Sequence, residues 1–294
     1  MELRQVEYFL AAVDHGGITP AAAALRVAQP SVSQGIRALE RELGVLLFDR
    51  IGRTLVVTSA GTAFIGPARR LLRGVAAAEG FFTDAGGVPR GRLDIHAWPF
   101  VTAHPVAELV GGFRQRFPQV SVRINELSDE QAAASLIRKG HCELVFCYLP
   151  AGARGLPAVE LGTHEYWLAF PPGTEIPAAD PLPLSELPDI GWVGVPKGSS
   201  QRTLVEQALR TAGARTRMSS VLQNRQAIPG FVLSGVGAGW VESSVARRLI
   251  GQGAVVRAVD PPIRRAYGMI YDPARLSPAG KAFVDLVLTP ERCP

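Results

Sequence analysis

The sequence is poor in cysteine and in long apolar runs, and each shortage excludes a class of protein. The only cysteines are Cys142, Cys147 and Cys293, and this odd, small set excludes a disulfide scaffold and fits a reducing compartment. No stretch approaches the roughly 20 apolar residues of a membrane-spanning helix. Glu2 and Arg4 interrupt the apolar core that a secretory leader needs. We therefore expect a cytoplasmic protein.

Catalytic and metal-binding motifs are also missing. The chain has no nucleophile elbow, no zinc-protease helix motif and no phosphate-binding loop motif. Gly235, Gly237 and Gly239 alternate without the dinucleotide-binding spacing, which favours a tight turn between a helix and a strand. The histidines lack metal-ligand spacing; they are His15, His96, His104, His141 and His164. We expect no enzyme activity, no metal and no cofactor.

Cys142 and Cys147 lie five positions apart, which leaves two interpretations open. They form a redox-switch pair, or they are small buried hydrophobic residues that flank a strand. The second interpretation is favoured, because the neighbouring sequence offers nothing that would lower a thiol pKa.

The composition describes a well-packed globular protein with a basic charge. Hydrophobic residues make up 47% and charged residues 19% of the 294 positions, and this length favours about two domains. The net charge of +5 permits an anionic partner. Lysine occurs only at Lys139, Lys197 and Lys281, so the basic side chains are mainly arginine. Arginine suits phosphates and guanine edges, although codon bias in a GC-rich genome also explains the excess.

Three short helices are predicted before residue 45. The first begins near Leu3 and ends at Gly16-Gly17. Thr19 offers an N-cap for the second helix, which continues to about Leu25. The third begins near Pro30 and ends at about Leu43, before the stop residue Gly44.

The third helix carries an apolar stripe opposite a polar face. The stripe consists of Val32, Ile36, Leu39 and Leu43, and the polar face of Ser31, Gln34, Arg37 and Arg41, with Ser33 beside it. Such side chains near a helix start read base edges and phosphates, so the pair of helices predicts a helix-turn-helix. The alternative is a helical hairpin with a solvated polar face.

A basic hairpin and a long helix follow. The strands are predicted at Val45–Phe48 and 54–58, with Arg50 and Arg53 at the tip, as in a wing that lies along DNA. An ordinary surface hairpin is the alternative. Thr58 caps a helix from 59 to about 85 whose apolar stripe needs a partner; the stripe is Leu71, Leu72, Val75, Ala78 and Phe82. A second copy of the chain is the simplest partner, and packing on its own domain is the alternative.

The first sixty residues resemble the LysR-type transcriptional regulators. The matching positions include Leu3-Arg4-Gln5, Gly16-Gly17-Ile18-Thr19, Ala28-Gln29-Pro30-Ser31-Val32-Ser33-Gln34, Leu47-Phe48-Asp49-Arg50 and Thr58-Ser59-Ala60-Gly61. The resemblance implies DNA contacts by Gln29, Pro30, Ser31, Ser33, Gln34 and Arg37, with Arg50 and Arg53 in the wing. It also implies dimers through the long helix, often paired into tetramers.

Two positions depart from the family pattern. Ile18 stands where an aromatic residue is usual, and Gly35 where a larger polar residue is common. Glycine within the third helix costs up to about 1 kcal/mol of helix stability and is expected to remove one DNA contact.

Strands and helices alternate after residue 91, which predicts an α/β sheet domain. Strands are expected at Leu93–Ala97, 120–124 and 144–148, with a capping box at Ser128 and Gln131. A second α/β part contains a strand at 167–170, and Ser277 caps the last helix. The resemblance implies a two-lobed sensor domain like that of periplasmic binding proteins.

The expected domains follow from these patterns and the resemblance. Residues 1–58 form a winged helix-turn-helix, 59–90 a linker helix and hinge for dimerisation, and 91–294 an effector-binding domain. Its first lobe covers about 91–162 and 267–294, and its second about 163–266.

Loops after strands and before helices are the expected effector site, because ligands of α/β sheets bind at strand ends and helix N-termini. The candidates are Trp98, Phe100, Thr102, Cys147, Tyr148, Lys197, Ser199, Ser200, Asn224 and Gln226. Lys197 and the nearby N–H groups suit a carboxylate. Trp98 and Phe100 are bulky where the family has small polar residues, which favours an aromatic or apolar ligand, or a cleft filled partly by its own side chains.

The predicted function is a sequence-specific, DNA-binding transcriptional regulator, modulated by a small-molecule effector in the cleft between the lobes. Its expected partners are double-stranded DNA, RNA polymerase and further copies of the chain, with nucleoid association when it is bound to DNA. An exported solute-binding protein needs a leader and leaves the first sixty residues unexplained. An architectural DNA binder without a ligand remains a further alternative.

Overall fold

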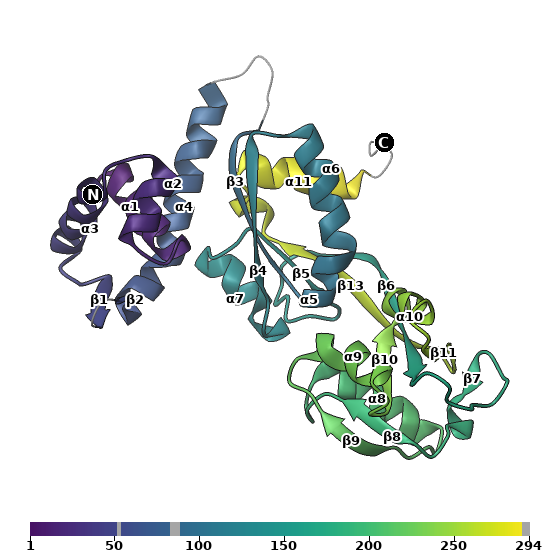
Figure 1. The fold of residues 1–294 in the computed structure, drawn as a ribbon. Coiled ribbons are helices and arrows are strands. Elements are labelled where there is room, and N and C mark those ends of the chain that lie inside the picture. Colours follow the sequence, from purple (N-terminus) through teal and green to yellow (C-terminus); the bar gives the residue numbers. More distant parts are fainter. Residues whose placement is uncertain (52–53, 83–88, 290–294) are drawn as a thin grey trace. The chain divides into compact units, whose positions relative to one another are not determined.

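The computed structural model describes residues 1–51, 54–82 and 89–289. These residues form two compact units, 1–160 with 268–294 and 161–267 (Figure 1). Within the described residues, no helix is both long and apolar enough to cross a membrane.

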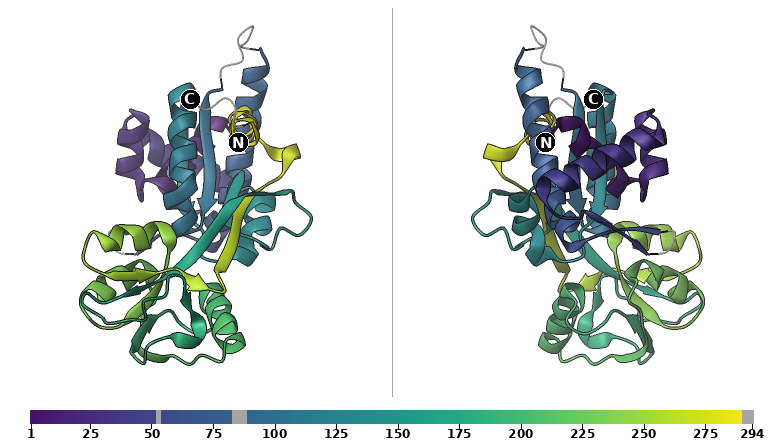
Figure 2. Two further views of the ribbon diagram at one scale, coloured as in Figure 1. Left: turned by 90° about the vertical axis from the view of Figure 1, so that its right-hand side faces the viewer. Right: turned by 90° about the vertical axis from the view of Figure 1, so that its left-hand side faces the viewer.

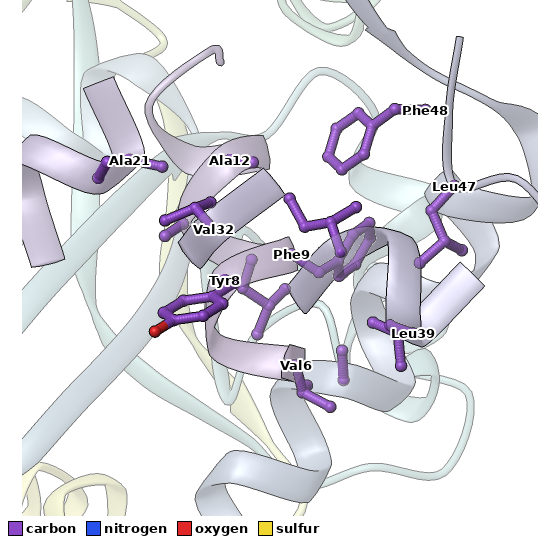
Figure 3. Close-up of a cluster of buried hydrophobic side chains, with 14 residues drawn as sticks. Val6, Tyr8, Phe9, Ala12, Ala21, Val32, Leu39, Leu47 and Phe48 are labelled. Atoms are coloured by element: carbon purple, nitrogen blue, oxygen red, sulfur yellow. The ribbon is translucent and has the colours of Figure 1, made fainter. Parts of the chain in front are cut away.

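The first unit begins with a small helical domain built around one apolar core. Its elements are α1 (Leu3–Asp14), α2 (Ile18–Leu25), α3 (Gln29–Leu43), the antiparallel hairpin of β1 (Phe48–Ile51) and β2 (Thr54–Val57), and α4 (Ser59–Phe82). Figure 3 shows the core with Phe9 and Phe48, whose ring centroids lie 5.5 Å apart. The ring centroid of Phe64 on α4 lies 5.3 Å from that of Phe9. Side chains from α1, α3, β1 and α4 therefore hold the helices in one fixed arrangement.

Two helix ends in this domain have the capping residues that the sequence predicts, and a third does not. Gly44 adopts the left-handed conformation at the end of α3, with φ of 71°. Thr58 precedes α4, and its hydroxyl accepts a hydrogen bond of 2.9 Å from the N–H of Gly61. The prediction that Thr19 caps the second helix is wrong: α2 begins at Ile18 after Gly17, so Thr19 lies inside the first turn.

The predicted strand at Val45–Phe48 is also wrong, because β1 begins only at Phe48. The carboxylate of Glu40 accepts hydrogen bonds from the N–H groups of Leu47 at 2.8 Å and Phe48 at 3.1 Å. These bonds hold residues 45–47 against α3, so the segment turns there before the hairpin starts.

The rest of the first unit is a parallel sheet with helices on both faces. Strand β3 (Gly91–Ala97) lies between β4 (Val120–Glu126) and β5 (Leu144–Tyr148) and pairs in parallel with both. Helices α6 (Ala107–Arg116) and α11 (Pro278–Leu288) lie side by side on one face (Figure 2). There Phe283 lies 5.0 Å from Phe113 and 6.2 Å from Phe146 between ring centroids. Helix α7 (Ala133–Lys139) packs on the other face.

Short turns link these elements. They are α5 (Pro99–Val101), a π-helical turn at Thr102–Val106 and 3-10 turns at Glu130–Ala132 and Pro273–Arg275. The capping prediction at Ser128 is wrong by one residue, since Asp129 accepts the hydrogen bond from the N–H of Gln131. Ser277 caps α11 as predicted, with a bond of 3.0 Å from the N–H of Gly280.

Strands β6 (Ala158–Phe170) and β13 (Ile263–Tyr271) carry the chain into and out of the second unit. The sheet order is β6, β10 (Ala238–Glu242), β8 (Gly191–Gly194) and β9 (Arg217–Val221), and β11 (Val255–Arg257) also pairs with β6. A separate pair joins β7 (Leu182–Pro183) to β12 (Val259–Asp260). The helices are α8 (Ser200–Thr211), α9 (Ile228–Leu233) and α10 (Ser243–Ile250), with 3-10 turns at Leu184–Glu186 and Arg225–Ala227.

The core of the second unit includes Trp192 and Trp240, whose stacked rings lie 5.9 Å apart. Gly235 and Gly237 occupy the turn between α9 and β10, as the sequence predicts. Gly235 has a φ of 81°, and a Cβ on Gly237 would overlap the carbonyl oxygen of Gly191. Both positions therefore require glycine.

Candidate nucleic-acid interface and sensor sites

Helix α3 separates its packing side chains from its polar ones. Val32, Ile36 and Leu39 are buried in the core. On the other side, Gln34 and Arg37 are exposed. The remaining predicted contacts near the helix start follow the same division: Gln29, Pro30 and Ser31 are exposed and Ser33 is half-buried. The residues expected to meet DNA thus share one accessible surface, and the residues that hold the helix lie beneath it.

Gly35 does not lie on that surface. A Cβ built on Gly35 would come within 2.5 Å of the Tyr8 ring, and Tyr8 is buried against α3. The expectation that Gly35 removes a DNA contact is therefore not supported by its position: this glycine allows α1 and α3 to approach closely.

The wing is described only in part. Arg50 is exposed on β1, where its Cα pairs with that of Leu55 on β2. The predicted contact Arg53 lies outside the described residues.

The predicted apolar stripe of α4 is divided between two environments. Leu72 is half-buried against the core of its own domain, together with Phe64 and Ile65. Leu71 and Ala78 are exposed and Val75 is half-buried; the side chain of Phe82 lies outside the description. Part of the stripe thus packs within the chain, and part remains accessible.

The predicted effector residues of the first unit surround the ends of β3 and β5. The N–H of Trp98 donates to the carbonyl of Phe146 at 2.8 Å, and the hydroxyl of Thr102 donates to the carbonyl of Trp98 at 3.1 Å. The Trp98 side chain packs on the apolar cluster that contains Cys147. Phe100 is half-buried, whereas Cys147 and Tyr148 are fully buried. Trp98, Phe100 and Thr102 are therefore the members with surface to offer a ligand.

Burial explains the chemistry of the cysteines. Cys142 and Cys147 are both buried, and neither is part of a disulfide. Loss of solvent raises the pKa of the Cys142 thiol far above its usual range, which keeps it protonated and unreactive. These features support the interpretation as small buried hydrophobic residues. Cys293 lies outside the described residues.

The predicted effector residues of the second unit lie at two helix starts. The hydroxyl oxygen of Ser199 caps α8, accepting from the N–H of Arg202 at 3.4 Å, and that of Ser200 accepts from Arg265 at 2.8 Å. Asn224 makes a capping bond of 3.0 Å to the N–H of Gln226. Lys197 and Gln226 are exposed. The polar groups are therefore positioned by local turns of the backbone.

The structure also contains a buried polar network beside these residues, which the sequence patterns did not reveal. The Gln201 amide donates to the carbonyl of Trp240 at 3.3 Å and accepts from Arg225 at 2.9 Å. Arg225 also lies 3.6 Å from the buried carboxylate of Glu242. The spacing of Gln201 with Val205 and Leu209 places it on the inner face of α8, a signal that sequence reasoning could have used. Arg225 lies between Asn224 and Gln226, two of the residues predicted to bind the effector.

No metal centre accompanies these polar groups in the part of the chain that the structure describes: no three His, Cys, Asp or Glu side chains there are grouped to hold an ion.

Known proteins resemble both parts of the chain. Residues 3–62 match the model of the bacterial regulatory helix-turn-helix protein of the LysR family, and residues 86–289 match the LysR substrate binding domain. The RuBisCO operon transcriptional regulator of Allochromatium vinosum is 27% identical over 98% of this chain and 96% of its own length.

A second relative and a solved structure agree with this assignment. The HTH-type transcriptional regulator TfdS of Cupriavidus pinatubonensis is 31% identical over 84% of each chain. The crystal structure of full-length CbnR complexed with its target DNA has a TM-score of 0.67 and 22% identity, covering 98% of this chain and 99% of that one. Because the matched models cover both the DNA-binding and the sensor parts, the chain belongs to the LysR family of bacterial DNA-binding transcriptional regulators.

Proposed function

We propose that the chain binds a specific DNA operator as a homodimer or a pair of dimers, with α3 in the major groove. The observation that carries this proposal is the exposed polar face of α3 opposite Val32, Ile36 and Leu39, which are buried in the core. The contact residues are Gln29, Pro30, Ser31, Ser33, Gln34 and Arg37, with Arg50 and Arg53 against the flanking backbone. Gln34 and Arg37 have the side chains that form paired hydrogen bonds to adenine and guanine.

Two copies of α3 in a symmetric dimer would enter successive major grooves about 34 Å apart, which requires an operator with inverted half-sites. The exposed part of the α4 stripe, Leu71 with Ala78, supports α4 as the dimer contact, because exposed apolar side chains on a long helix favour a partner helix. Regulation then follows when the bound protein changes the recruitment of RNA polymerase, with the protein on the nucleoid in the cytoplasm.

A small organic anion is the proposed effector of the sensor domain. In the second unit, the exposed ammonium of Lys197, the capping side chains of Ser199 and Asn224, and the neighbouring Ser200 and Gln226 support binding of a carboxylate. In the first unit, Trp98 and Phe100 are half-buried and offer aromatic surface, with Thr102 beside them and Cys147 and Tyr148 in the strand below. The effector class that suits both sets is an aromatic acid.

Capture of genomic fragments at physiological salt tests the DNA proposal. Wild-type protein should recover a few discrete sites with inverted half-sites. Arg37→Ala should lose about 1–3 kcal/mol of specific binding if Arg37 pairs with a guanine. Arg248→Ala is the matched control, because Arg248 is an exposed arginine in the second unit. Equal recovery of all fragments by wild type and Arg37→Ala would contradict sequence-specific recognition by this face.

A thermal-melting screen with benzoate-type acids tests the effector proposal. A binding acid should raise the melting temperature of wild type by mass action and raise it less for Lys197→Ala. Lys281→Ala is the control, since Lys281 is an exposed lysine on α11. Tryptophan fluorescence measured on the same samples should change, and a flat response in both measurements across the screen would count against an aromatic acid.

A further inference from the structure

One face of the first unit's sheet is unusually polar. Along β3, Arg92, Asp94 and His96 alternate with buried Leu93 and Ile95. In the paired register of β4, Arg123 lies beside Asp94 and Asn125 beside His96. A covered face of a parallel sheet ordinarily carries apolar residues. Asp94 is nevertheless only 1% exposed, and the other polar side chains of this face are half-buried. Something polar must therefore cover them.

The DNA-binding domain of the same chain supplies that cover through Asp14, the last residue of α1. Its carboxylate lies 3.0 Å from Arg69 of α4 and 2.7 Å from Arg92 of β3, and it also pairs with Arg123 of β4. The side chain of Asp14 is only 9% exposed. One carboxylate thus joins the DNA-binding domain to two strands of the sensor part.

Helix α4 makes a second set of contacts, with the C-terminal end of α7. Arg69 donates to the carbonyl of His141 and Arg73 to that of Gly140, both at 3.0 Å. Arg70 donates to the carbonyl of Lys139. These carbonyls lie at or just beyond the end of a helix, where partners within the helix are missing and positive charge is favoured. Three arginines of α4 therefore bind the end of α7.

The approach of the two helices is close enough to require glycine. A Cβ on Gly66 of α4 would overlap the carbonyl oxygen of Lys139. The three atoms nearest to that Cβ position all belong to Lys139 and Gly140 of the sensor part. Gly74, one turn beyond Arg70, has nothing within 4 Å of its own Cβ position.

One side of α4 is therefore apolar, and the side that meets the sensor part is charged. Ala68, Phe64 and Leu72 pack into the apolar core of the DNA-binding domain, so α4 and that domain stay together. Arg69 and Arg73 face the sensor part with charge, and burial lowers the pKa of both guanidinium groups. Desolvation offsets much of the attraction in a buried ion pair. Separation of this contact would expose charged groups that water solvates well, as in the more polar interfaces between mobile domains.

We propose that Asp14 with its three arginines, together with the contact of α4 on the end of α7, forms a reversible latch. The latch holds the DNA-binding domain in one orientation on the sensor part of its own chain, and its opening frees that orientation. Gln34 and Arg37 stay exposed while the latch is closed, so the latch sets the direction of α3 without blocking DNA. It gives the sensor part a route to the DNA-binding domain through the sheet, in addition to the chain connection.

A steric test uses full-length protein and a matched pair of glycine variants. Spin labels on cysteines at Glu42 of α3 and Glu108 of α6, both exposed, report the distance between the two parts; Cys293→Ser prevents labelling of the tail. Labelled chains are diluted with unlabelled protein to suppress distances between subunits. Gly66→Ala should add a second, broader distance population that wild type and Gly74→Ala lack. Identical distributions for Gly66→Ala and Gly74→Ala would overturn the latch.

An electrostatic test addresses Asp14 independently. Asp14→Asn should produce the same second population, whereas Glu7→Gln, which removes an exposed carboxylate from the same helix, should not. Circular dichroism confirms that both variants keep their helices, and Arg123→Gln, on the sensor side, separates loss of the latch from damage to α1. If Asp14→Asn and Arg123→Gln both keep the single wild-type distance, the ionic part of the proposal is wrong.

Discussion

The DNA-reading surface of α3 and the polar network of the second unit use similar side chains in opposite ways. Gln34 and Arg37 are exposed and play no part in the domain core. Gln201 and Arg225 are shielded and bind each other, and Arg225 also lies beside the buried carboxylate of Glu242. Binding and stability are therefore separable on α3, because different faces of the helix perform them. In the second unit, Gln201 and Arg225 use their polar groups to hold the fold together.

This difference has a physical origin. A groove of DNA is read by side chains that reach into it from a surface, so the protein must leave their hydrogen-bonding groups free until DNA arrives. Polar groups inside a domain are costly unless they are paired, so a buried site must satisfy its own members first.

Arg225→Ala should have the largest effect. The substitution removes a side chain that is 13% exposed and leaves the Glu242 carboxylate, 5% exposed, without this cation. Loss of one partner from a buried ion pair costs about 3–5 kcal/mol, so we expect the second unit to lose about that much stability. Urea unfolding followed by tryptophan fluorescence measures it, because Trp167, Trp192 and Trp240 all lie in this unit.

The control for this prediction is Arg248→Ala, which truncates an exposed arginine of α10. A surface substitution of this kind usually changes stability by less than about 0.5 kcal/mol. If the two variants unfolded at the same urea concentration, the network would have no structural role.

Acid should reduce the stability of the first unit through His96. Burial, the nearby Arg69 and His141 together lower the pKa of His96 to about 4, whereas an unfolded histidine has a pKa near 6.5. Between these values the unfolded chain binds more protons, so stability that is fully present above about pH 6.5 is lost as the pH falls toward 4. We expect a loss of roughly 1–2 kcal/mol between pH 7 and pH 5.

His96→Gln provides the comparison, because glutamine does not titrate and keeps a polar side chain. Its unfolding free energy should change less with pH than that of wild type over the same range. Since burial also lowers the pKa of His141, a reduced slope should remain. An unchanged slope would mean that His96 does not carry the effect.

Gly35→Ala tests the boundary between the two faces of α3. Alanine should favour the helix by about 0.5–1 kcal/mol over glycine, but its Cβ would come within 2.5 Å of the Tyr8 ring. Overpacking typically costs about 1–3 kcal/mol, so we expect a net loss of about 1 kcal/mol by thermal unfolding. Gly74→Ala, with open space around its Cβ, should be stabilising, and a stabilising Gly35→Ala would place Gly35 outside the core.

The helices, most of the strands and the α/β class depend on local patterns of apolar and polar residues. Such patterns are visible in the sequence, and they predicted these features well. The stripe of α3, the cap by Thr58 and the strand at 144–148 depend only on neighbours in the chain. The strand predicted at Val45–Phe48 failed because Glu40, on another element, binds the backbone there. Hydrophobic periodicity carries no information on a hydrogen bond of that kind.

The candidate sites also divide into those that local patterns predict and those that only tertiary packing creates. The exposed residues of α3 were predictable, because the polar face opposite an apolar stripe must be accessible. Gln201, Arg225 and Glu242 come from three different segments of the second unit. Asp14 of α1 pairs with arginines from three further elements, which are α4, β3 and β4. Charges that pair over such distances along the chain show no spacing to recognise. Tertiary packing, which a single sequence does not display, decides them.

Gln34→Ala should have the smallest effect on stability and a clear effect on DNA binding. Its side chain is exposed, and the shift in unfolding free energy should stay within about 0.5 kcal/mol. If Gln34 pairs with an adenine, specific affinity should fall by about 1–3 kcal/mol, while affinity for unrelated DNA stays nearly constant because phosphate contacts dominate it. Titration of operator and unrelated duplexes at one salt concentration measures both. Equal weakening for the two duplexes would show that Gln34 contacts the backbone, and a large loss of stability would show that the two faces of α3 are not independent.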